Sequence, residues 1–164
     1  MDAILKKVDH AALKVNQGFN IAALLVAFIL DIPWIVAAVA LIMLAGTAIG
    51  RPGFFFLYAG LLRPLRIVRP DPREDNPEPH RFAQGFGGVV AAIASVLLLA
   101  GGGPGPALGG WVLSWLVIVL AAANLFAGFC AGCAVYYWLG RLNIPGFSRT
   151  PPRGTVPGMR PRAS

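Results

Sequence analysis

The placement of positive charge is the feature that most constrains this chain. Its 14 lysine and arginine residues fall in three groups: three before residue 15, six between residues 51 and 81, and five from residue 141 onward. Residues 15–50 and 82–140 contain none of them and are strongly apolar. Basic groups that bracket apolar runs indicate membrane-spanning helices with their positive ends inside. Only 13% of the residues are charged, against roughly 25% in soluble domains. We therefore expect an all-α integral membrane protein.

Each apolar segment is long enough to hold two spans. Asp31-Ile32-Pro33 divides the first segment as a turn, since a charge at the bilayer centre costs roughly 2.5–3.5 kcal/mol. The uncharged, glycine-rich residues 100–110 divide the second segment as a flexible outer loop. The alternative, one long span over residues 21–49, would leave the N-terminal lysines outside. Four spans put every basic residue on one side, so we expect two helical hairpins with both termini cytoplasmic.

The expected boundaries follow from these turns. A four-helix membrane domain over residues 1–142 precedes a disordered basic tail over residues 143–164, which is rich in proline, glycine and arginine. Residues 1–17 predict a mixed helix start. In lipid, the amides of the first span need partners from other helices; they are Asn16, Gln17 and Asn20. The expected spans cover residues 13–31, 33–50, 81–100 and 111–139, and the cytoplasmic loop covers residues 51–80.

The central loop is expected to hold a surface helix and an extended polar segment. Residues 54–62 are aromatic and apolar and are followed by arginines, which predicts a cytoplasmic helix lying on the membrane surface. Four prolines hold residues 69–80 extended, and Asn76 before Pro77 predicts a helix N-cap. We expect an ordered loop in which acidic groups pair with their own arginines, a hard-cation site being the alternative. Its candidate residues are Asp71, Arg73, Glu74, Asp75, Glu78 and His80.

The basic residues favour the lipid bilayer as a partner over nucleic acid. They do not lie on one helix face interleaved with stacking aromatics, as nucleic-acid-binding segments do. Lipid phosphate is the default ligand of arginines beside a membrane, and a small anion is the alternative. Asn124 lies in the expected fourth span. It could line a polar pathway through the bundle, and one interhelical hydrogen bond explains it equally well. The candidate anion or lipid contacts are Arg51, Arg63, Arg66 and Asn124.

Cys130 and Cys133 form a C-x-x-C motif, the spacing of dithiol redox enzymes. We expect them inside the fourth span, about two turns from its C-terminal end, where the dipole and the apolar surroundings both favour the thiol. A reactive pair therefore requires the helix to open near Gly132 and a cation, Arg141 or a central-loop arginine, to approach. The alternative is that both cysteines are small packing residues. A zinc or copper(I) site with His10 or His80 is weaker, because structural zinc uses four ligands; we predict no metal and no cofactor.

Four strings carry a resemblance to a known family: VDHAALKVNQG, GRPGFFFLYAGLLRPL, VRPDPREDNPEPHRFAQGFGG and NLFAGFCAGCAVYYWL. On these strings the chain resembles the bacterial integral-membrane family catalogued as domain of unknown function (DUF) 4395, over about residues 8–147. The resemblance implies a bacterial cytoplasmic membrane. It also implies a thiol connection, because some relatives are associated with thioredoxin-like or sulfur-transfer proteins.

Two functional hypotheses remain. The first is a membrane-embedded dithiol protein that handles electrons or sulfur for a soluble thiol partner, with Cys130 and Cys133 as its reactive pair. The second is a non-catalytic membrane scaffold or accessory subunit, or a passage for a small solute. Cysteine accessibility separates them, because a relay needs thiols that a partner can reach. The sequence does not determine the substrate, the partner or the oligomeric state.

Overall fold

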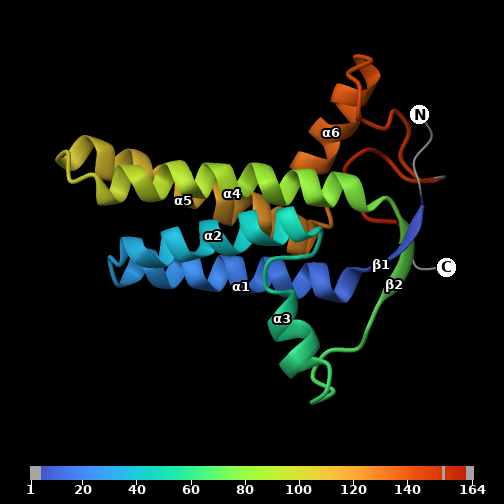
Figure 1. The fold of residues 1–164 in the computed structure, drawn as a ribbon, viewed down its shortest axis with the longest axis horizontal. Coiled ribbons are helices and arrows are strands. Elements are labelled where there is room, and N and C mark those ends of the chain that lie inside the picture. Colours follow the sequence, from blue (N-terminus) through green and yellow to red (C-terminus); the bar gives the residue numbers. More distant parts are fainter. Residues whose placement is uncertain (1–4, 153, 162–164) are drawn as a thin grey trace.

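Four long helices run side by side along the molecule (Figure 1). The computed structural model describes residues 5–152 and 154–161. A two-stranded sheet and two further short helical segments lie at the end of the bundle that also holds the C-terminal tail. The long helices are α1 (His10–Ile29), α2 (Pro33–Ile49), α4 (Pro77–Leu99) and α5 (Pro104–Ala122), which continues as a π-helical turn, η2 (Ala123–Ala127). The remaining elements are β1 (Lys6–Asp9), α3 (Phe55–Leu57) with the π-helical turn η1 (Tyr58–Leu62), β2 (Pro72–Asp75) and α6 (Ala131–Arg141).

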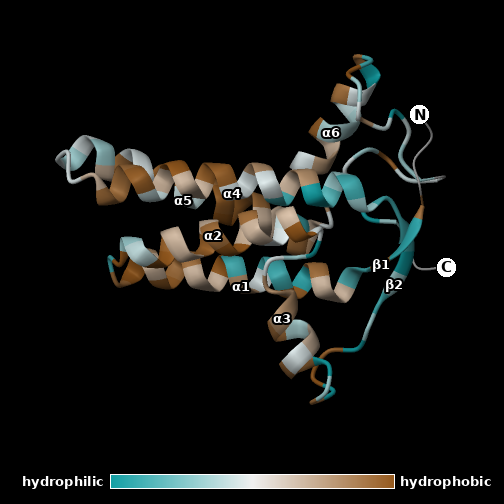
Figure 2. Cartoon of the chain, in the orientation of Figure 1, coloured by the Kyte–Doolittle hydropathy of each residue, from teal (hydrophilic) through white to brown (hydrophobic). Residues whose placement is uncertain are grey.

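Three of the helices are long and apolar enough to cross a membrane: His10–Ile29, Pro77–Leu99 and the continuous Pro104–Ala127. The apolar helix α2 has 17 residues, which reach about 26 Å at 1.5 Å per residue. Figure 2 shows apolar residues along the length of the bundle, while the hydrophilic residues concentrate at the end that carries the sheet. Large apolar side chains such as Leu41 and Val96 are 70% and 64% exposed. An apolar exterior of this kind suits lipid as the surrounding solvent.

The core of the bundle is built where all four long helices meet. Its fully buried members come from each helix, and the small residues among them allow close approach. They are Leu24, Ala27, Val36, Val39, Met43, Ala94, Val117 and Ile118. Gly46 allows the segment after α2 to fold back closely on it, because a Cβ there would lie 2.7 Å from the Cα of Gly53. Gly50, the second glycine of the G-x-x-x-G pattern, instead ends α2 in a left-handed conformation with φ 76°.

Buried amides join α1 to the segment that follows α2. The side chain of Asn16 accepts a hydrogen bond from the backbone N–H of Phe54 at 2.9 Å. Gln84 of α4 accepts from Gly53 N–H at 3.1 Å and donates to the carbonyl oxygen of Met43 at 3.0 Å. The expected need for interhelical partners is thus met at Asn16. Asn20 is 1% exposed, and neither polar atom of its side chain has a partner among the described residues.

Lys6–Asp9 form a strand, β1, which corrects the helix start expected over residues 1–17 at these positions; residues 10–17 are helical, and residues 1–4 lie outside the described part of the chain. β1 pairs antiparallel with β2, with Lys6 opposite Asp75 and Asp9 opposite Pro72. The helix begins only at His10, where the Asp9 carboxylate caps it by accepting from Ala11 N–H at 3.0 Å. Strand pairing wins here because the proline-rich loop already holds residues 72–75 extended and offers its backbone groups. The sheet brings the start of the chain to the central loop.

The turn expected at Asp31 is present, and Asp31 adopts a left-handed conformation with φ 51°. α4 begins at Pro77, four residues before the expected position, with the predicted Asn76 cap accepting from Glu78 N–H at 3.1 Å. α5 begins at Pro104, so the outer loop is shorter than the predicted residues 100–110. Proline is favoured at a first helical position because its missing N–H needs no partner there.

The expected single helix over residues 111–139 is wrong. The π-helical turn ends at Ala127, Gly128 adopts a left-handed conformation with φ 67°, and a separate helix, α6, starts at Ala131. A glycine in this conformation is a common way to terminate a helix. The break sets α6 at an angle to α5 in Figure 1.

The loop helix and the tail complete the fold. A short helical segment does cover residues 55–62, as expected, and it projects from the side of the bundle (Figure 1). The sequence predicts a disordered tail over residues 143–164. In the structure, Phe129 and Met159 form an antiparallel bridge, so the described part of the tail returns to the start of α6.

Candidate functional site

Cys130 and Cys133 lie at the beginning of α6 and are joined by a disulfide, with 5.2 Å between their Cα atoms. Cys130 is the N-cap residue, and its Sγ accepts a hydrogen bond from the Cys133 N–H at 3.1 Å. The expected position near a helix C-terminus is therefore wrong, because the helix breaks at Gly128 rather than loosening at Gly132. The N-terminal end of a helix and its free N–H groups stabilise a thiolate. The helix dipole therefore favours a thiolate at this position, whereas the sequence predicted that it would disfavour one.

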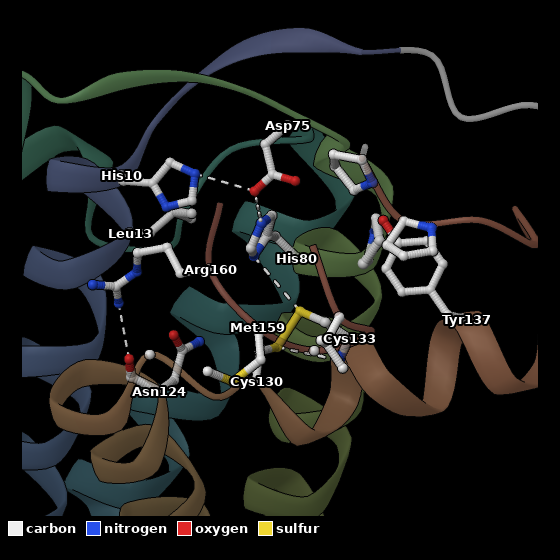
Figure 3. Close-up of a pocket in the computed structure, with 16 residues that line it drawn as sticks. His10, Leu13, Asp75, His80, Asn124, Cys130, Cys133, Tyr137, Met159 and Arg160 are labelled. Carbon is white, nitrogen blue, oxygen red and sulfur yellow. Dashed lines mark hydrogen bonds and ion pairs between the residues drawn. A yellow bond between two sulfur atoms is a disulfide. The ribbon is translucent and has the colours of Figure 1, made fainter. Parts of the chain in front are cut away.

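His80 connects the disulfide to a buried carboxylate. Its Nδ1 lies 3.6 Å from Cys133 Sγ, and its Nε2 lies 2.9 Å from Asp75 Oδ2. The Asn76 cap places His80 in the first turn of α4, and β2 places Asp75 beside it. Figure 3 shows this line of groups from Asp75 through His80 to the sulfur. An imidazole held between a carboxylate and a thiol is positioned to give a proton to that sulfur or to take one from it.

Asp75 is the anchor of this arrangement and is 4% exposed. Burial alone would raise the pKa of its carboxyl group. Hydrogen bonds from His10, His80 and the Asn76 N–H outweigh that effect and hold the pKa well below its usual range. His10 Nε2 lies 3.1 Å from the same carboxylate oxygen that His80 contacts. The carboxylate therefore stays ionised and is shared between two imidazoles.

A tyrosine and an arginine complete the polar lining. Burial raises the pKa of Tyr137 to about 12, so its phenol stays protonated near neutral pH. Arg160 of the tail donates to the backbone carbonyl oxygen of Asn124 at 2.9 Å. Burial, the largest effect on this guanidinium, lowers its pKa. Among the described residues, Arg160 is the arginine that lines the cavity, and the expected Arg141 does not line it.

The cavity around these groups is small and covered. It holds about 20 Å³ and is lined on one side by His10, Asp75, His80 and the two cysteines. Cys130 and Cys133 are 6% and 4% exposed. The tail forms the opposite wall, through Pro151, Pro152, Val156, Gly158, Met159 and Arg160. A partner protein cannot reach the sulfurs while the tail holds this position.

The other predicted residues divide between the site and the surface. Asp71 pairs with Arg73 at 2.9 Å, as expected for a self-neutralised loop, whereas Asp75 pairs with histidines. Asn124 lines the cavity. Arg51 stacks over the Phe55 ring, with its Cζ 5.2 Å from the centroid. The residues exposed outside the site are Arg51, Arg63, Arg66, Glu74 and Glu78.

Sequence reasoning did not find Tyr137, Met159 or Arg160 as site residues. Tyr137 is one helical turn beyond Cys133, and a correct α6 boundary would have pointed to it. The tail residues carried no such signal, because their place beside α6 depends on main-chain pairing with residues 128–130. His10 was considered only as a metal ligand.

Two groups of side chains have the composition of metal sites. Ligand atoms of His80, Cys130 and Cys133 lie within 4.8 Å of one another, as do those of His10, Asp75 and His80. In the first group the two sulfurs are bonded to each other. In the second group, the Asp75 carboxylate is already paired with both histidines.

A family model described as domain of unknown function (DUF4395) matches residues 8–141 of the chain. This range contains both cysteines, both histidines and Asp75, and ends before the covering tail. No curated protein and no solved structure matches the chain.

Proposed function

The chain belongs to the DUF4395 family, whose description assigns no activity, and we propose from its own residues that it is a dithiol–disulfide oxidoreductase. In this proposal Cys130 and Cys133 exchange electrons with a soluble thiol protein, at one end of a membrane-embedded bundle. The observation that carries the proposal is the position of the C-x-x-C motif. It opens a helix, and its second sulfur faces an imidazole that is paired to a buried carboxylate.

In this proposal the two cysteines have different roles, which their different surroundings support. A thiolate of the partner attacks Cys130 Sγ, the Cys130–Cys133 bond breaks, and the electron pair leaves on Cys133 Sγ. His80 Nδ1, 3.6 Å away, supplies the proton that neutralises this leaving thiolate. The partner's second thiolate then attacks the partner sulfur of the mixed disulfide and releases Cys130 as a thiolate, which the helix N-terminus stabilises. The partner is oxidised by two electrons and the Cys130–Cys133 pair is reduced by two; the reverse sequence oxidises the pair.

Charge placement supports a cytoplasmic location for this site. With four membrane crossings, the basic N-terminus, central loop and tail share one side, and the positive-inside rule makes that side cytoplasmic. Disulfides in the cytosol are mostly transient and catalytic or redox-sensing, because thiols there are kept reduced. A disulfide at this end of the bundle is therefore more consistent with turnover than with a structural crosslink.

The interior of the bundle favours this proposal over a solute passage. Apolar side chains from all four long helices fill its centre, including Leu24, Val39 and Ile118. Two of its polar side chains, Asn16 and Gln84, are hydrogen-bonded to backbone groups, and Asn20 is the buried amide that has no partner among the described residues.

Equilibration of the purified protein with glutathione buffers tests the proposal. Free thiols are alkylated at each ratio of reduced to oxidised glutathione and counted by mass spectrometry. We expect one transition in which two thiols appear together, and no such transition in Cys130→Ser or Cys133→Ser. If a phosphine opens the disulfide but no thiol buffer does, the bond is structural and the proposal fails.

A further inference from the structure

The backbone immediately before the disulfide is paired to the tail of the same chain. Cys130 N–H donates to the carbonyl oxygen of Gly158 at 2.7 Å, and Arg160 N–H donates to the carbonyl oxygen of Gly128 at 3.0 Å. Phe129 and Met159 face each other in this antiparallel bridge. Both hydrogen bonds join main-chain groups, so another extended segment can repeat them if it carries glycine at the Gly158 position, where a Cβ would lie 3.0 Å from Cys130 O.

The backbone of residues 128–130 is free to pair with the tail because the helix is interrupted there. Gly128 is left-handed and Cys130 is extended, with φ −101° and ψ 101°. The chain therefore leaves the helix for three residues between η2 and α6, and the backbone edge that this exposes is paired by the tail. Such an edge is a template for an added strand. The last residue of this segment is Cys130, whose sulfur is the atom that the partner's thiolate attacks in the proposed function.

We propose that residues 128–130 are the docking edge for an extended, cysteine-bearing segment of a soluble thiol protein, and that the tail occupies this edge in its absence. The proposal rests on the proposed function. The partner segment runs antiparallel to residues 128–130 and repeats the two main-chain hydrogen bonds made by Gly158 and Arg160. It thereby delivers its thiolate to Cys130 from the side that the tail now covers.

Burial makes displacement of the tail a requirement. The two sulfurs are 6% and 4% exposed, whereas exchange needs a thiolate to approach one sulfur along the axis of the S–S bond. Beyond residue 150, two side-chain hydrogen bonds join the described part of the tail to the rest of the chain: Arg160 to Asn124 O and Arg73 to Pro161 O. A partner that supplies equivalent backbone bonds can replace it without leaving buried N–H or carbonyl groups unpaired.

Two glycines of the tail provide a matched pair of full-length variants. A Cβ at Gly158 would lie 2.9 Å from Ala134 Cβ and 3.0 Å from Cys130 O, and its φ is +85°. Gly158→Ala therefore pushes the tail off the edge. Gly154 has φ +77° but no atom within 4 Å of a Cβ built there. Gly154→Ala introduces the same backbone strain in the same tail without a collision at the docking edge.

The experiment compares three reductants of the Cys130–Cys133 disulfide in detergent or lipid nanodiscs. They are dithiothreitol, a short peptide with two cysteines, and the same peptide with the backbone nitrogens flanking its first cysteine methylated. We expect the peptide to reduce Gly158→Ala at least tenfold faster than the parent chain and Gly154→Ala within twofold of it. We also expect the methylated peptide to lose most of this advantage, because it cannot donate to the carbonyl oxygen of Gly128.

The possible results separate this inference from the proposed function. If dithiothreitol reduces all three chains but the two peptides act equally on Gly158→Ala, the pair is redox-active and the docking edge is wrong. If the peptide reduces the parent chain and Gly158→Ala at the same rate, the tail does not occupy the partner's place. If no dithiol reduces any chain, the proposed function fails and the docking edge fails with it.

Discussion

His80 makes two contacts that together determine how Cys133 can react. One ring nitrogen faces the sulfur and the other faces the Asp75 carboxylate, so the carboxylate fixes the orientation of the ring. The same logic orients imidazoles in many catalytic sites. Cys130 Sγ, which also lies within 4.8 Å of a His80 ring nitrogen, instead caps the N-terminus of α6. The two sulfurs of the motif thus have different surroundings. These suit Cys130 Sγ for attack by a partner thiolate and Cys133 Sγ as the leaving group.

Replacement of His80 by alanine should slow exchange at Cys133 without unfolding the chain. Removal of a positioned proton donor lowers a rate by about 100-fold or more. The measurement is the rate of disulfide reduction by dithiothreitol at pH 7, accompanied by thermal melting. Glu78→Ala, an exposed change in the same helical turn, serves as the control. Equal rates for His80→Ala and the parent chain would remove His80 from the chemistry.

The lowered pKa of Asp75 predicts a loss of stability in acid. A carboxyl whose pKa is lower in the folded than in the unfolded chain stabilises the fold fully above its usual value of 3.8, and this contribution is lost as the pH falls below that value. The groups facing it are His10 of α1, His80 of α4 and Tyr137 of α6.

Melting temperatures of the parent chain and Asp75→Asn between pH 7 and pH 3 test this prediction. At pH 7 the variant should be less stable by about 3 kcal/mol, since it leaves a buried pair broken. The difference should shrink as the pH falls below 4. A difference that stays constant down to pH 3 would show that Asp75 ionisation does not stabilise the fold.

The two buried asparagines of α1 should respond oppositely to leucine. Asn16→Leu removes the acceptor of the Phe54 N–H, and an unpaired buried donor costs about 1–3 kcal/mol. Asn20 has no partner among the described residues, so Asn20→Leu should be neutral or stabilising. Thermal melting in one detergent gives both values. Equal destabilisation would mean that Asn20 has a partner, such as a bound water or lipid.

At the scale of elements, Gly128 decides whether the C-x-x-C motif caps a helix or lies inside one. Gly128→Ala should destabilise the chain by about 1–2 kcal/mol, because a left-handed conformation is unfavourable for alanine. It should also slow thiol exchange, since a continuous helix would remove Cys130 from its cap position. Gly18 lies in α1 with open space around it, and Gly18→Ala should be neutral. Thermal melting and exchange rates provide the comparison, and an unchanged exchange rate in Gly128→Ala would contradict it.

The sequence predicted helices where apolar runs had clear terminators. Asp31 to Pro33 and Asn76-Pro77 marked turns and caps through local chemistry, and both are present. Gly128 was missed because its neighbours are apolar and a glycine in such a run also suits helix packing. Because the helix break at Gly128 was not predicted, both cysteines were expected inside a helix and not at its start. Neither strand was expected. Each has only four residues, which is too short to show a periodic pattern, and each pairs with a segment about 65 positions away in the sequence.

The candidate site was predicted in part, for the same reason. C-x-x-C spacing identified the cysteines, and the polar loop contained Asp75 and His80. Their meeting depends on the sheet and on the start of α6, which are tertiary features. Arg160 and Met159 came from a tail whose composition suggested disorder. Its placement rests on backbone hydrogen bonds, which composition does not encode.

At the scale of the whole molecule, the polar groups gather at one end and the apolar helices extend from it (Figure 2). The sheet, α6 and the tail all belong to the polar end, while the α1–α2 and α4–α5 connections turn at the other end (Figure 1). A bilayer therefore has one natural position, around the helices between the two ends. In that position α2, about 26 Å long, would cross with its neighbours although it is shorter than they are.

Labelling of single cysteines should reveal this orientation. In a chain with Cys130→Ser and Cys133→Ser, cysteines replace Asp31, Glu74 or Gly102, and intact cells are treated with a maleimide that cannot cross the membrane. We expect labelling at Asp31→Cys and Gly102→Cys but at Glu74→Cys only after the cells are opened, because the basic loop remains inside. Labelling of Asp31→Cys and Gly102→Cys from opposite sides would mean that α1 and α2 do not both cross. Labelling of Glu74→Cys in intact cells would place the disulfide outside, where a stable structural bond is the ordinary expectation, and would remove the compartment argument for turnover.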